Sequence, residues 1–364
     1  MQIILAPARK DLGFKVGLLP FWPMLHAIKK AVRHIALRDA DLPQQCTIGL
    51  SDPQTEVRVW LHGFGDPIDV THNHVVACAA APFTVGIGLD RNWNLETSAR
   101  DLSLTFRESD GKGRLLADVG LRSSETLSSD NQSLSLFHIR SCRNYCLPRA
   151  RVWAYDRYQS FVRHRDDKNP EIPLSVLEAR SMTAFFICPR PVVLVSVKHG
   201  DAGNIFPMNL LGSIGDGYFA FALNSLRKAA PLVERAGRAV LSTIPFNYAE
   251  LVRQLGKNHR KESVNCEDLP FETTTSKVLG FPIPEFALRV REVEIKVVRK
   301  LGSHTLFFGR LLQDECRRES LQFYMVHGIY EAWRRKAYAS PTQLLPEHSS
   351  KAANFVQPGA IERR

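Results

Sequence analysis

The stretch CPRPVVLVSVKHGDAGNIFPMNLLGS, residues 188–213, decides the fold of the second half of this chain. Within it, the apolar run at residues 191–197 is typical of a buried strand. The turn HGDAGN holds two glycines, and apolar runs follow at residues 204–214 and 216–223. Short strands joined by tight turns predict an antiparallel arrangement of neighbouring strands.

A basic loop and a long hairpin follow these strands. The loop NSLRKA, residues 224–229, precedes a predicted helix at 230–236, where free amides and two cations would suit a phosphate group. A solvated basic helix start is the alternative explanation of the same residues. Residues 287–302 alternate as a long strand, and residues 303–315 return from it as the second strand of a hairpin.

The order of these pieces, closed by GSHTLFFGRL at residues 302–311, resembles the flavin reductase-like family of FMN-binding split barrels over about residues 174–338. The resemblance implies a mainly β chain with peripheral helices (α+β), whose C-terminal split β-barrel follows a second β-rich domain. It implies FMN as the cofactor, FAD as the alternative, and NAD(P)H as the hydride donor to flavin N5. It further implies a homodimer and electrons that pass to oxygen, to a partner monooxygenase or to a bound substrate.

The resemblance also assigns roles to single residues. His304 is the candidate catalytic residue, near the flavin or the nicotinamide entrance. Three positions depart from the family pattern: Ala229 replaces a threonine, Ser242 replaces an asparagine, and Lys261 lacks the aromatic residue that usually follows it. The implied cofactor-binding residues are Met208, Asn209, Leu210 and Ser213 along the ring, Asn224, Ser225, Arg227 and Lys228 at the phosphate, Lys261 nearby, and Tyr330 across a subunit boundary.

Two other functions stay open beside an NAD(P)H-dependent flavin oxidoreductase. One is an FMN-binding protein that carries or senses flavin without turnover. The other is a scaffold that kept the barrel, lost the flavin and docks a partner through its N-terminal domain. Ala229 and the altered context of Lys261 favour changed binding, whereas Asn209, Ser213, Arg227 and His304 favour a working site.

The first half of the chain resembles no family, and its sequence shows no repeat of the second half. Alternating runs between residues 55 and 138 predict an antiparallel sheet or barrel, and helices are predicted at residues 20–38 and 149–165. The charged, proline-containing stretch RHRDDKNPEIP marks the boundary. We expect a β-rich domain of unknown function at residues 1–170, the barrel at 174–338 and a flexible tail at 339–364.

Composition narrows the remaining possibilities. The net charge of +11 is spread along the chain without a basic block interleaved with aromatic residues, so we expect no nucleic-acid partner. Seven scattered cysteines and the lack of a leader or a long apolar run predict a cytoplasmic protein that does not enter a membrane. We also expect no metal site. The strongest candidates for one are His72 and His74, helped by His62 or Asp69, and the pair Cys142 and Cys146.

Overall fold

The computed structural model describes residues 28, 32, 42–89, 102–110, 112–130, 132–165, 174–215 and 217–338. Residues Met1–Asp41 form a unit of their own, and the fold below is that of the unit that begins at Leu42. The predicted helix at 20–38 lies outside the described residues apart from Ile28 and Val32, which are helical. The predicted tail and residues 166–173 of the predicted linker lie outside them as well. In the described part, no helix has both the length and the apolar character needed to span a membrane.

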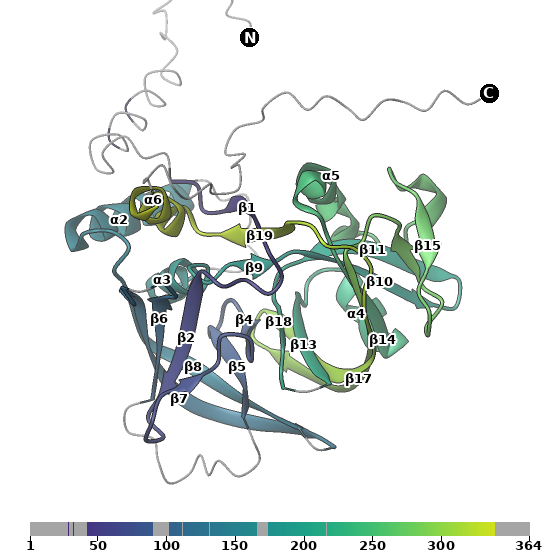
Figure 1. Ribbon diagram of the computed structural model, residues 1–364, viewed down its shortest axis with the longest axis horizontal. Helices are drawn as coiled ribbons and strands as arrows, with labels where there is room; N and C mark the ends of the chain where they lie inside the picture. The colour runs from purple at the N-terminus through teal and green to yellow at the C-terminus, as the bar shows by residue number, and fades with distance from the viewer. Residues whose placement is uncertain are drawn as a thin grey trace, which may run out of the picture. The chain divides into compact units, whose positions relative to one another are not determined.

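Within the described residues, the C-terminal part forms one seven-stranded antiparallel sheet with the order β11-β10-β14-β17-β18-β13-β12 (Figure 1). Alternate residues of its strands, such as Val193, Val195 and Val197, point into one apolar core against α4 (Ala229–Ala236). This confirms the predicted barrel and its closing hairpin. The strands are β10 (Val193–His199), β11 (Ala202–Met208), β12 (Leu211–Ser213), β13 (Tyr218–Asn224), β14 (Arg238–Thr243), β17 (Arg289–Leu301) and β18 (His304–Cys316).

Short helices cover β11 on its outer side. Asn258 in η2 donates its amide to Ile205 O (2.8 Å), and Asn204 donates back to Asn258 O (3.1 Å), so the helix and the strand are locked together. The chain between β14 and β17 forms short helical segments and two short strands. The elements here are η1 (Phe246–Tyr248), α5 (Ala249–Gln254), η2 (Leu255–Arg260), η3 (Cys266–Asp268), β15 (Thr273–Thr275) and β16 (Pro282–Pro284).

The N-terminal part is a second β-rich region, as expected. Its described strands form a seven-stranded antiparallel sheet with the order β3-β2-β6-β7-β8-β5-β4. Val57, Val59 and Leu61 alternate inward on one strand, which fits the alternation seen in the sequence. The strands are β2 (Val57–His62), β3 (Ile68–Asp69), β4 (His74–Cys78), β5 (Thr84–Leu89), β6 (Ser103–Glu108), β7 (Leu115–Ser129) and β8 (Gln132–Asn144).

A third sheet and three helices join the two parts. Strand β1 (Cys46–Leu50) near the start of the unit pairs with β19 (Gln322–Val326) near its end, and β19 also pairs with β9 (Arg190–Pro191). The connecting segment contains α2 (Arg149–Arg165), which has the predicted bounds, and α3 (Val176–Phe185). The last helix is α6 (Gly328–Ala337). Residues far apart in the sequence therefore build one compact unit.

The two seven-stranded sheets of the described chain repeat one topology. In both, the first strand in chain order pairs with the second and the fifth, and the third pairs with the fourth. The fourth also pairs with the seventh, the fifth with the sixth, and the sixth with the seventh. The structure thus corrects the expectation that the first half holds no repeat of the second.

The repeat extends to register. Strands β8 and β18 begin at Gln132 and His304, 172 positions apart, and both are 13 residues long. The preceding strands carry two irregularities at matching places. In β7 these lie at Gly120/Leu121 and Ser123/Glu125, and in β17 they lie 172 positions later, at Glu292/Val293 and Ile295/Val297. β-bulges fix the bend of a hairpin, so this match shows two copies of one folded unit.

The two copies meet through equivalent elements. Strand β4 packs on its counterpart β12, and β7 packs on its counterpart β17. Contacts between like elements are what a two-fold axis produces. The shared apolar core holds Leu134 and Leu136 from one copy and their counterparts Leu306 and Phe308 from the other. Small residues allow the close approach on both sides: Gly86 and Gly88 on β5, and Ala220 and Ala222 on β13.

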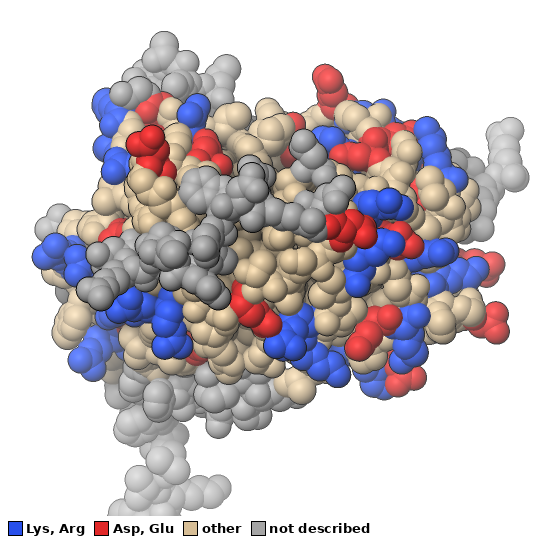
Figure 2. Space-filling model, turned by 90° about the horizontal axis from the view of Figure 1, so that it is seen from below, with Lys and Arg blue, Asp and Glu red and all other residues tan. Residues whose placement is uncertain are grey.

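Charge is distributed rather than gathered on the face seen in Figure 2, where basic and acidic side chains alternate. Several of them form ion pairs, such as Arg299 with Glu125 at 2.9 Å, which joins β17 to β7 across the two copies. Exposed pairs of this kind contribute about 0–1 kcal/mol each. The apolar core between the copies is therefore the main source of their cohesion.

Candidate functional site

The basic loop after β13 is held by its own hydrogen bonds and by the β17–β18 turn. Ser225 donates its amide to Ser303 O (3.0 Å), and its hydroxyl lies 3.0 Å from Thr305 Oγ1. Asn224 accepts the Leu226 amide on its side chain (2.9 Å) and the Arg227 amide on its carbonyl (3.0 Å). The loop is thus fixed before any ligand binds.

The loop leads directly into α4, whose first turn has free donors. The amides of Lys228 and Ala229 make no hydrogen bond with a described residue, as expected for the start of a helix. Arg227 is half-buried, and Lys228 is exposed and pairs with Glu262 at 3.1 Å. Two amides and two cations therefore face one region, which suits an anionic group.

His304 is the ladder partner of Asn224, so the predicted catalytic residue and the predicted phosphate loop lie on neighbouring strands. Its side chain is 8% exposed, and burial lowers its pKa to about 4. The imidazole is therefore neutral at pH 7. Ser303 donates its hydroxyl to Ala80 O (3.0 Å), so it accepts from His304 Nδ1 (2.7 Å). That network assigns the proton to Nδ1 and leaves Nε2 as an acceptor with no described partner.

The first half of the chain forms one wall of this site, which the sequence does not reveal. Cys78 Sγ lies 3.8 Å from His304 Nδ1, and Ala80 O accepts from both the amide and the hydroxyl of Ser303. Gly302 has a φ of +46°, and a Cβ there would lie 2.2 Å from Ala81 O. Only glycine permits this approach.

The strand predicted to lie along the flavin ring presents a mixed set of groups. The Met208 side chain is buried in the barrel core, so it does not face a ligand on the outside. The Asn209 amide lies 3.4 Å from Met325 Sδ, a weak acceptor, and the Ser213 hydroxyl donates to Gly215 O at 3.2 Å. Leu210 O accepts the Ala222 amide (2.8 Å), which fixes this strand against β13.

The helical segment at residues 255–261 borders the same region. His259 Nε2 lies 2.7 Å from Pro207 O, and its ring packs on Phe206. Burial is the main cause that lowers the pKa of His259, and the positive charge of Arg227 adds to it. Lys261 is exposed, and its carbonyl accepts from Asn204 (3.0 Å). Among these basic residues, Arg227 and His259 lie close enough to interact.

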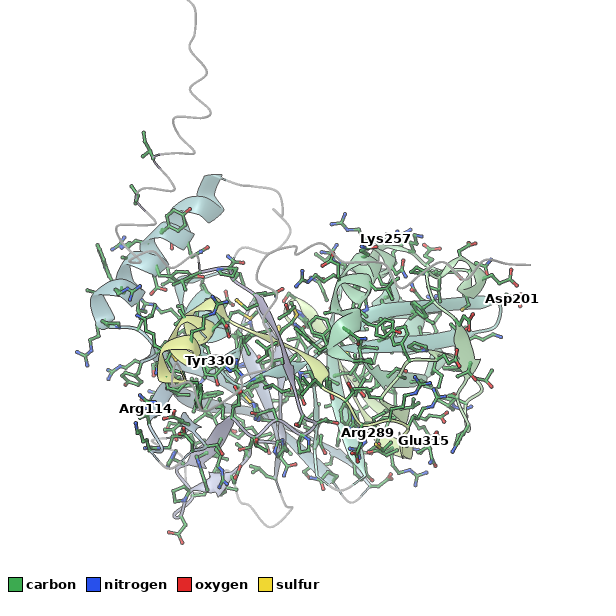
Figure 3. The ribbon with its side chains drawn as sticks, turned by 45° about the horizontal axis from the view of Figure 1, so that its top comes forward. Arg114, Asp201, Lys257, Arg289, Glu315 and Tyr330 are labelled. Atoms are coloured by element: carbon green, nitrogen blue, oxygen red, sulfur yellow. The ribbon has the colours of Figure 1, made fainter. Side chains whose placement is uncertain are left out.

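Tyr330 belongs to a different part of the molecule. It is fully buried on α6, donates its hydroxyl to Glu56 (3.1 Å) and stacks on Trp333. Figure 3 shows Tyr330 beside Arg114, well apart from Lys257 of η2. Its partner residues come from the N-terminal copy and from α6, so we leave it out of the site proposed below.

Five of the six residues considered as metal ligands, all except His72, contact separate partners. His62 contacts Thr105, Asp69 accepts from Thr71, and His74 contacts Val70 O and Arg190. The two thiols donate to backbone carbonyls, Cys142 to Arg180 O and Cys146 to Leu116 O. Within the described residues, no group of three or more His, Cys, Asp or Glu is placed to hold a metal ion.

Comparison with known families finds one match. Residues 185–333 match the family model of the flavin reductase like domain, so this part of the chain is similar to that domain. The match does not extend to the N-terminal copy. No curated protein matches the chain.

Three solved structures illustrate the likeness. An FMN-binding protein from Thermus thermophilus with bound p-hydroxybenzaldehyde is 27% identical over 35% of this chain and 73% of its own, with a TM-score of 0.32. An NADH:FAD oxidoreductase from Streptomyces globisporus is 15% identical over 40% and 86%, with a TM-score of 0.37. The flavin reductase component of a bacterial two-component tryptophan halogenase is 20% identical over 41% and 97%, with a TM-score of 0.36.

Proposed function

We propose that this chain, whose C-terminal part is a flavin reductase-like domain, binds FMN and takes a hydride from NAD(P)H onto it. The observation that carries the proposal is the junction of a basic loop with a neutral buried histidine. Arg227, Lys228 and two free amides lie at one end, and His304 lies on the adjacent strand. This pairing of an anion site with an uncharged acceptor suits a nucleotide with a polar, neutral ring.

The residues present fit FMN, with FAD as the alternative. Arg227, Lys228 and the first amides of α4 would hold the phosphate. Asn209 would orient the ring edge, and Ser213, whose hydroxyl donates to Gly215 O, could still accept a hydrogen bond from the ring. The fit is weaker than the family pattern in one respect. Ala229 offers no hydroxyl, and the hydroxyl of Ser225 is already engaged with Thr305 (3.0 Å).

The chemistry divides between the cofactor and the protein. Bound FMN supplies a ring that accepts a hydride at N5. His304 holds no charge, so it positions a partner through Nε2, for example the carboxamide N–H of a nicotinamide, without drawing a proton. Cys78 and Ala80 close one side and limit the entry of water. The electrons then pass to oxygen, to a partner monooxygenase or to a bound substrate.

Free thiols are consistent with a cytoplasmic location, where nicotinamide donors are reduced. All seven cysteines are free, and burial raises the pKa of Cys142 to about 12 and also raises the pKa of Cys188. These two thiols are therefore protonated and inert.

Retention of flavin is the first test. The purified protein is mixed with FMN, separated from free flavin and examined by absorbance before and after anaerobic NADH or NADPH. Retained flavin that bleaches is the expected result. Retained flavin that bleaches with neither donor would refute the oxidoreductase and leave a flavin carrier. No retention and no turnover with excess flavin would leave a scaffold.

A pair of double variants tests the phosphate loop. Arg227→Ala with Lys228→Ala should weaken FMN at least tenfold and riboflavin hardly at all, since only FMN carries the phosphate. The control is Arg235→Ala with Arg238→Ala, which removes the same charge from exposed positions in the last turn of α4 and at the start of β14. Equal losses for FMN and riboflavin, or equal effects of the two double variants, would contradict the assignment.

His304→Gln tests the catalytic role. Glutamine occupies the equivalent position in the N-terminal copy, at Gln132, so the fold should tolerate it. We expect FMN to stay bound and its reduction by NAD(P)H in single-turnover measurements to slow tenfold or more. An unchanged rate of reduction would make His304 a structural residue.

A further inference from the structure

A pocket of about 360 Å³ opens between the two copies and belongs to neither alone. Its N-terminal wall carries His72 and His74, and its C-terminal wall carries Arg190, Arg291 and Gln322. Val193, Leu211 and Phe219 give it an apolar side. Ser213, one of the residues expected to line the flavin ring, lies at its edge.

Arg190 brings a buried charge without a counter-charge into this pocket. It is 4% exposed and donates to Phe185 O (3.1 Å), with His74 Nε2 2.9 Å from its Nη2. Burial and then the charge of Arg190 lower the pKa of His74 to about 3, so His74 is neutral. Within the described residues Arg190 forms no ion pair. A buried guanidinium in this state is costly, and an anion would offset the cost.

The other charges at the pocket balance one another. Arg289 pairs with Asp314 (2.6 Å) and approaches Asp52 (3.8 Å). Arg291 approaches the same two carboxylates, at 3.4 Å and 3.6 Å. Two arginines thus face two aspartates, and Arg190 is the surplus cation. This balance favours a ligand with one negative charge.

Gln322 supplies a second, independent sign of a ligand. Its side chain is 1% exposed, lines the pocket, and both Nε2 and Oε1 lack a hydrogen-bond partner. Buried amides are nearly always paired, so an orphaned donor and acceptor at one cavity point to an occupant. The amide can donate to a carboxylate and accept from a neighbouring hydroxyl or amine.

Comparison of the two copies shows that the pocket is not a simple consequence of the fold. At the positions of Arg289 and Arg291, the N-terminal copy has Ala117 and Val119. Next to these positions the N-terminal copy has an aromatic cluster, in which Phe185 of α3 packs on Phe83 and Phe106 with centroids 5.1 Å and 5.3 Å apart. The arginines are therefore a feature of the C-terminal copy alone.

We propose that this pocket binds a small organic carboxylate, with its anionic end on Arg190 and Gln322 and its apolar body on Val193, Leu211 and Phe219. Binding of the carboxylate needs no cofactor. The further role of such a carboxylate as the molecule that takes up the electrons rests on the proposed function.

The test measures binding to the full-length protein by calorimetry with benzoate, its neutral isostere benzamide, and phenyl phosphate. Benzoate should bind in the millimolar range or tighter and at least tenfold more tightly than either other probe. Gln322→Leu should weaken benzoate at least tenfold, and its thermal midpoint should stay at or above that of the parent, because no protein hydrogen bond is lost. Gln254→Leu, at an exposed position, should change neither quantity.

Three results would overturn the proposal. Benzamide binding as tightly as benzoate would remove the role of charge. Benzoate binding that is absent, or unchanged in Gln322→Leu, would remove the site. A fall in the thermal midpoint of Gln322→Leu like that expected for Gln54→Leu, whose amide bonds the backbone at Val57 (2.9 Å), would make Gln322 structural.

The repeat in register carries a second inference. We infer that the N-terminal copy stands where a second subunit would stand, so the chain completes its own site and is a monomer of 41.0 kDa. Equivalent contacts on the two sides of the two-fold axis that relates the copies support this inference. The β4–β5 connection with Ala80 and Ala81 covers Gly302, and the β12–β13 connection with Gly215 meets the β7–β8 turn at Gln132.

This inference replaces the homodimer implied by the resemblance, and light scattering tests it without flavin. A mass near 41.0 kDa at all concentrations from 1 to 100 µM is expected, and a stable mass near twice that value would overturn the inference. Titration with FMN then measures how many FMN molecules bind per chain, and this prediction rests on the proposed function. Because only one copy carries a histidine at the position of His304, we expect one FMN per chain, and two per chain would contradict the inference. Failure to bind any FMN would count against the proposed function alone.

Discussion

The junction of the two copies can be tested at Gly88. A Cβ at this position would lie 2.9 Å from Ile214 Cγ2, 3.0 Å from Ile214 C and 3.1 Å from Ile214 Cα. Ordinary contacts of a Cβ are 3.4–4 Å. Two of the three atoms are backbone, so a side-chain rotation cannot relieve the clash, and β5 and the β12–β13 turn must move apart.

From these distances we expect Gly88→Ala to lower the free energy of unfolding by about 1–3 kcal/mol, the usual cost of overpacking a core. Gly86→Ala should cost less, because its Cβ would meet side-chain tips, Leu134 Cδ1 at 2.9 Å and Val75 Cγ1 at 3.1 Å, which can rotate. Gly256→Ala is the control. Nothing lies within 4 Å of its Cβ, and we expect a change within about 0.5 kcal/mol.

Urea unfolding followed by both fluorescence and circular dichroism measures the effect. Because the copies share one core, the whole transition of Gly88→Ala should move to lower urea with an unchanged slope. A midpoint equal to that of the parent would refute the packing argument. A transition that splits into two steps would refute the idea that the copies unfold together.

Three further predictions concern groups outside the proposed flavin site. Arg334→Met should cost about 3–5 kcal/mol in chemical unfolding, because it removes the counter-charge of Glu56, which Arg334 contacts through two nitrogens, and leaves that carboxylate with only the Tyr330 hydroxyl among these contacts. Glu56→Gln in the same chain should recover part of the loss, and a loss below 1 kcal/mol would contradict the estimate. Burial lowers the pKa of both His74 and His327 to about 3, below their unfolded value of 6.5. Their stabilisation is therefore complete above pH 6.5 and falls by up to about 1.4 kcal/mol per pH unit for each histidine as the pH drops toward 3. Unfolding by urea at pH 7.5, 6 and 5 checks this, and a flat profile would exclude it. Cys316, the exposed thiol of the described chain, should be the first to react with a thiol reagent under native conditions, and Cys316→Ser should remove that fast phase.

Much of the fold follows from local sequence pattern. The long alternation between residues 287 and 315, broken only at its glycine turn, predicts a hairpin, and the structure places β17 and β18 there. The aromatic and basic run at residues 149–165 predicts a helix with the bounds that α2 has. Both signals are local, because a period of two or of 3.6 residues reflects which face of one element is buried.

The repeat is invisible in the sequence for a physical reason. A sheet position requires a suitable volume and polarity on the correct face, not a particular residue. His74 and Leu211 are equivalent positions, as are Val119 and Arg291, and neither pair would align by identity. What the copies share is pairing, register and bulges, which are properties of the backbone.

The candidate site could be predicted only within one copy. The basic loop and His304 stand in recognisable local patterns, and the structure places them on adjacent strands. The wall formed by Ala80 depends on its contact with Ser303, 223 positions later in the sequence. Tyr330 likewise forms a hydrogen bond with Glu56, 274 positions away. Such long-range pairings leave no periodic trace in the sequence, so they emerge only from the folded chain.

The distance between the copies along the chain has a consequence for synthesis. Leu134 and Leu136 leave the ribosome long before Leu306 and Phe308, which lie 172 positions later and complete their side of the shared core. At about 5–20 residues per second, the first apolar face waits about 10–35 s for its partner. In a homodimer, the wait depends on how fast a second subunit diffuses to the first. In this chain, the wait is set by the speed of translation. The nascent N-terminal sheet is therefore a natural client for chaperones that shield apolar β surfaces.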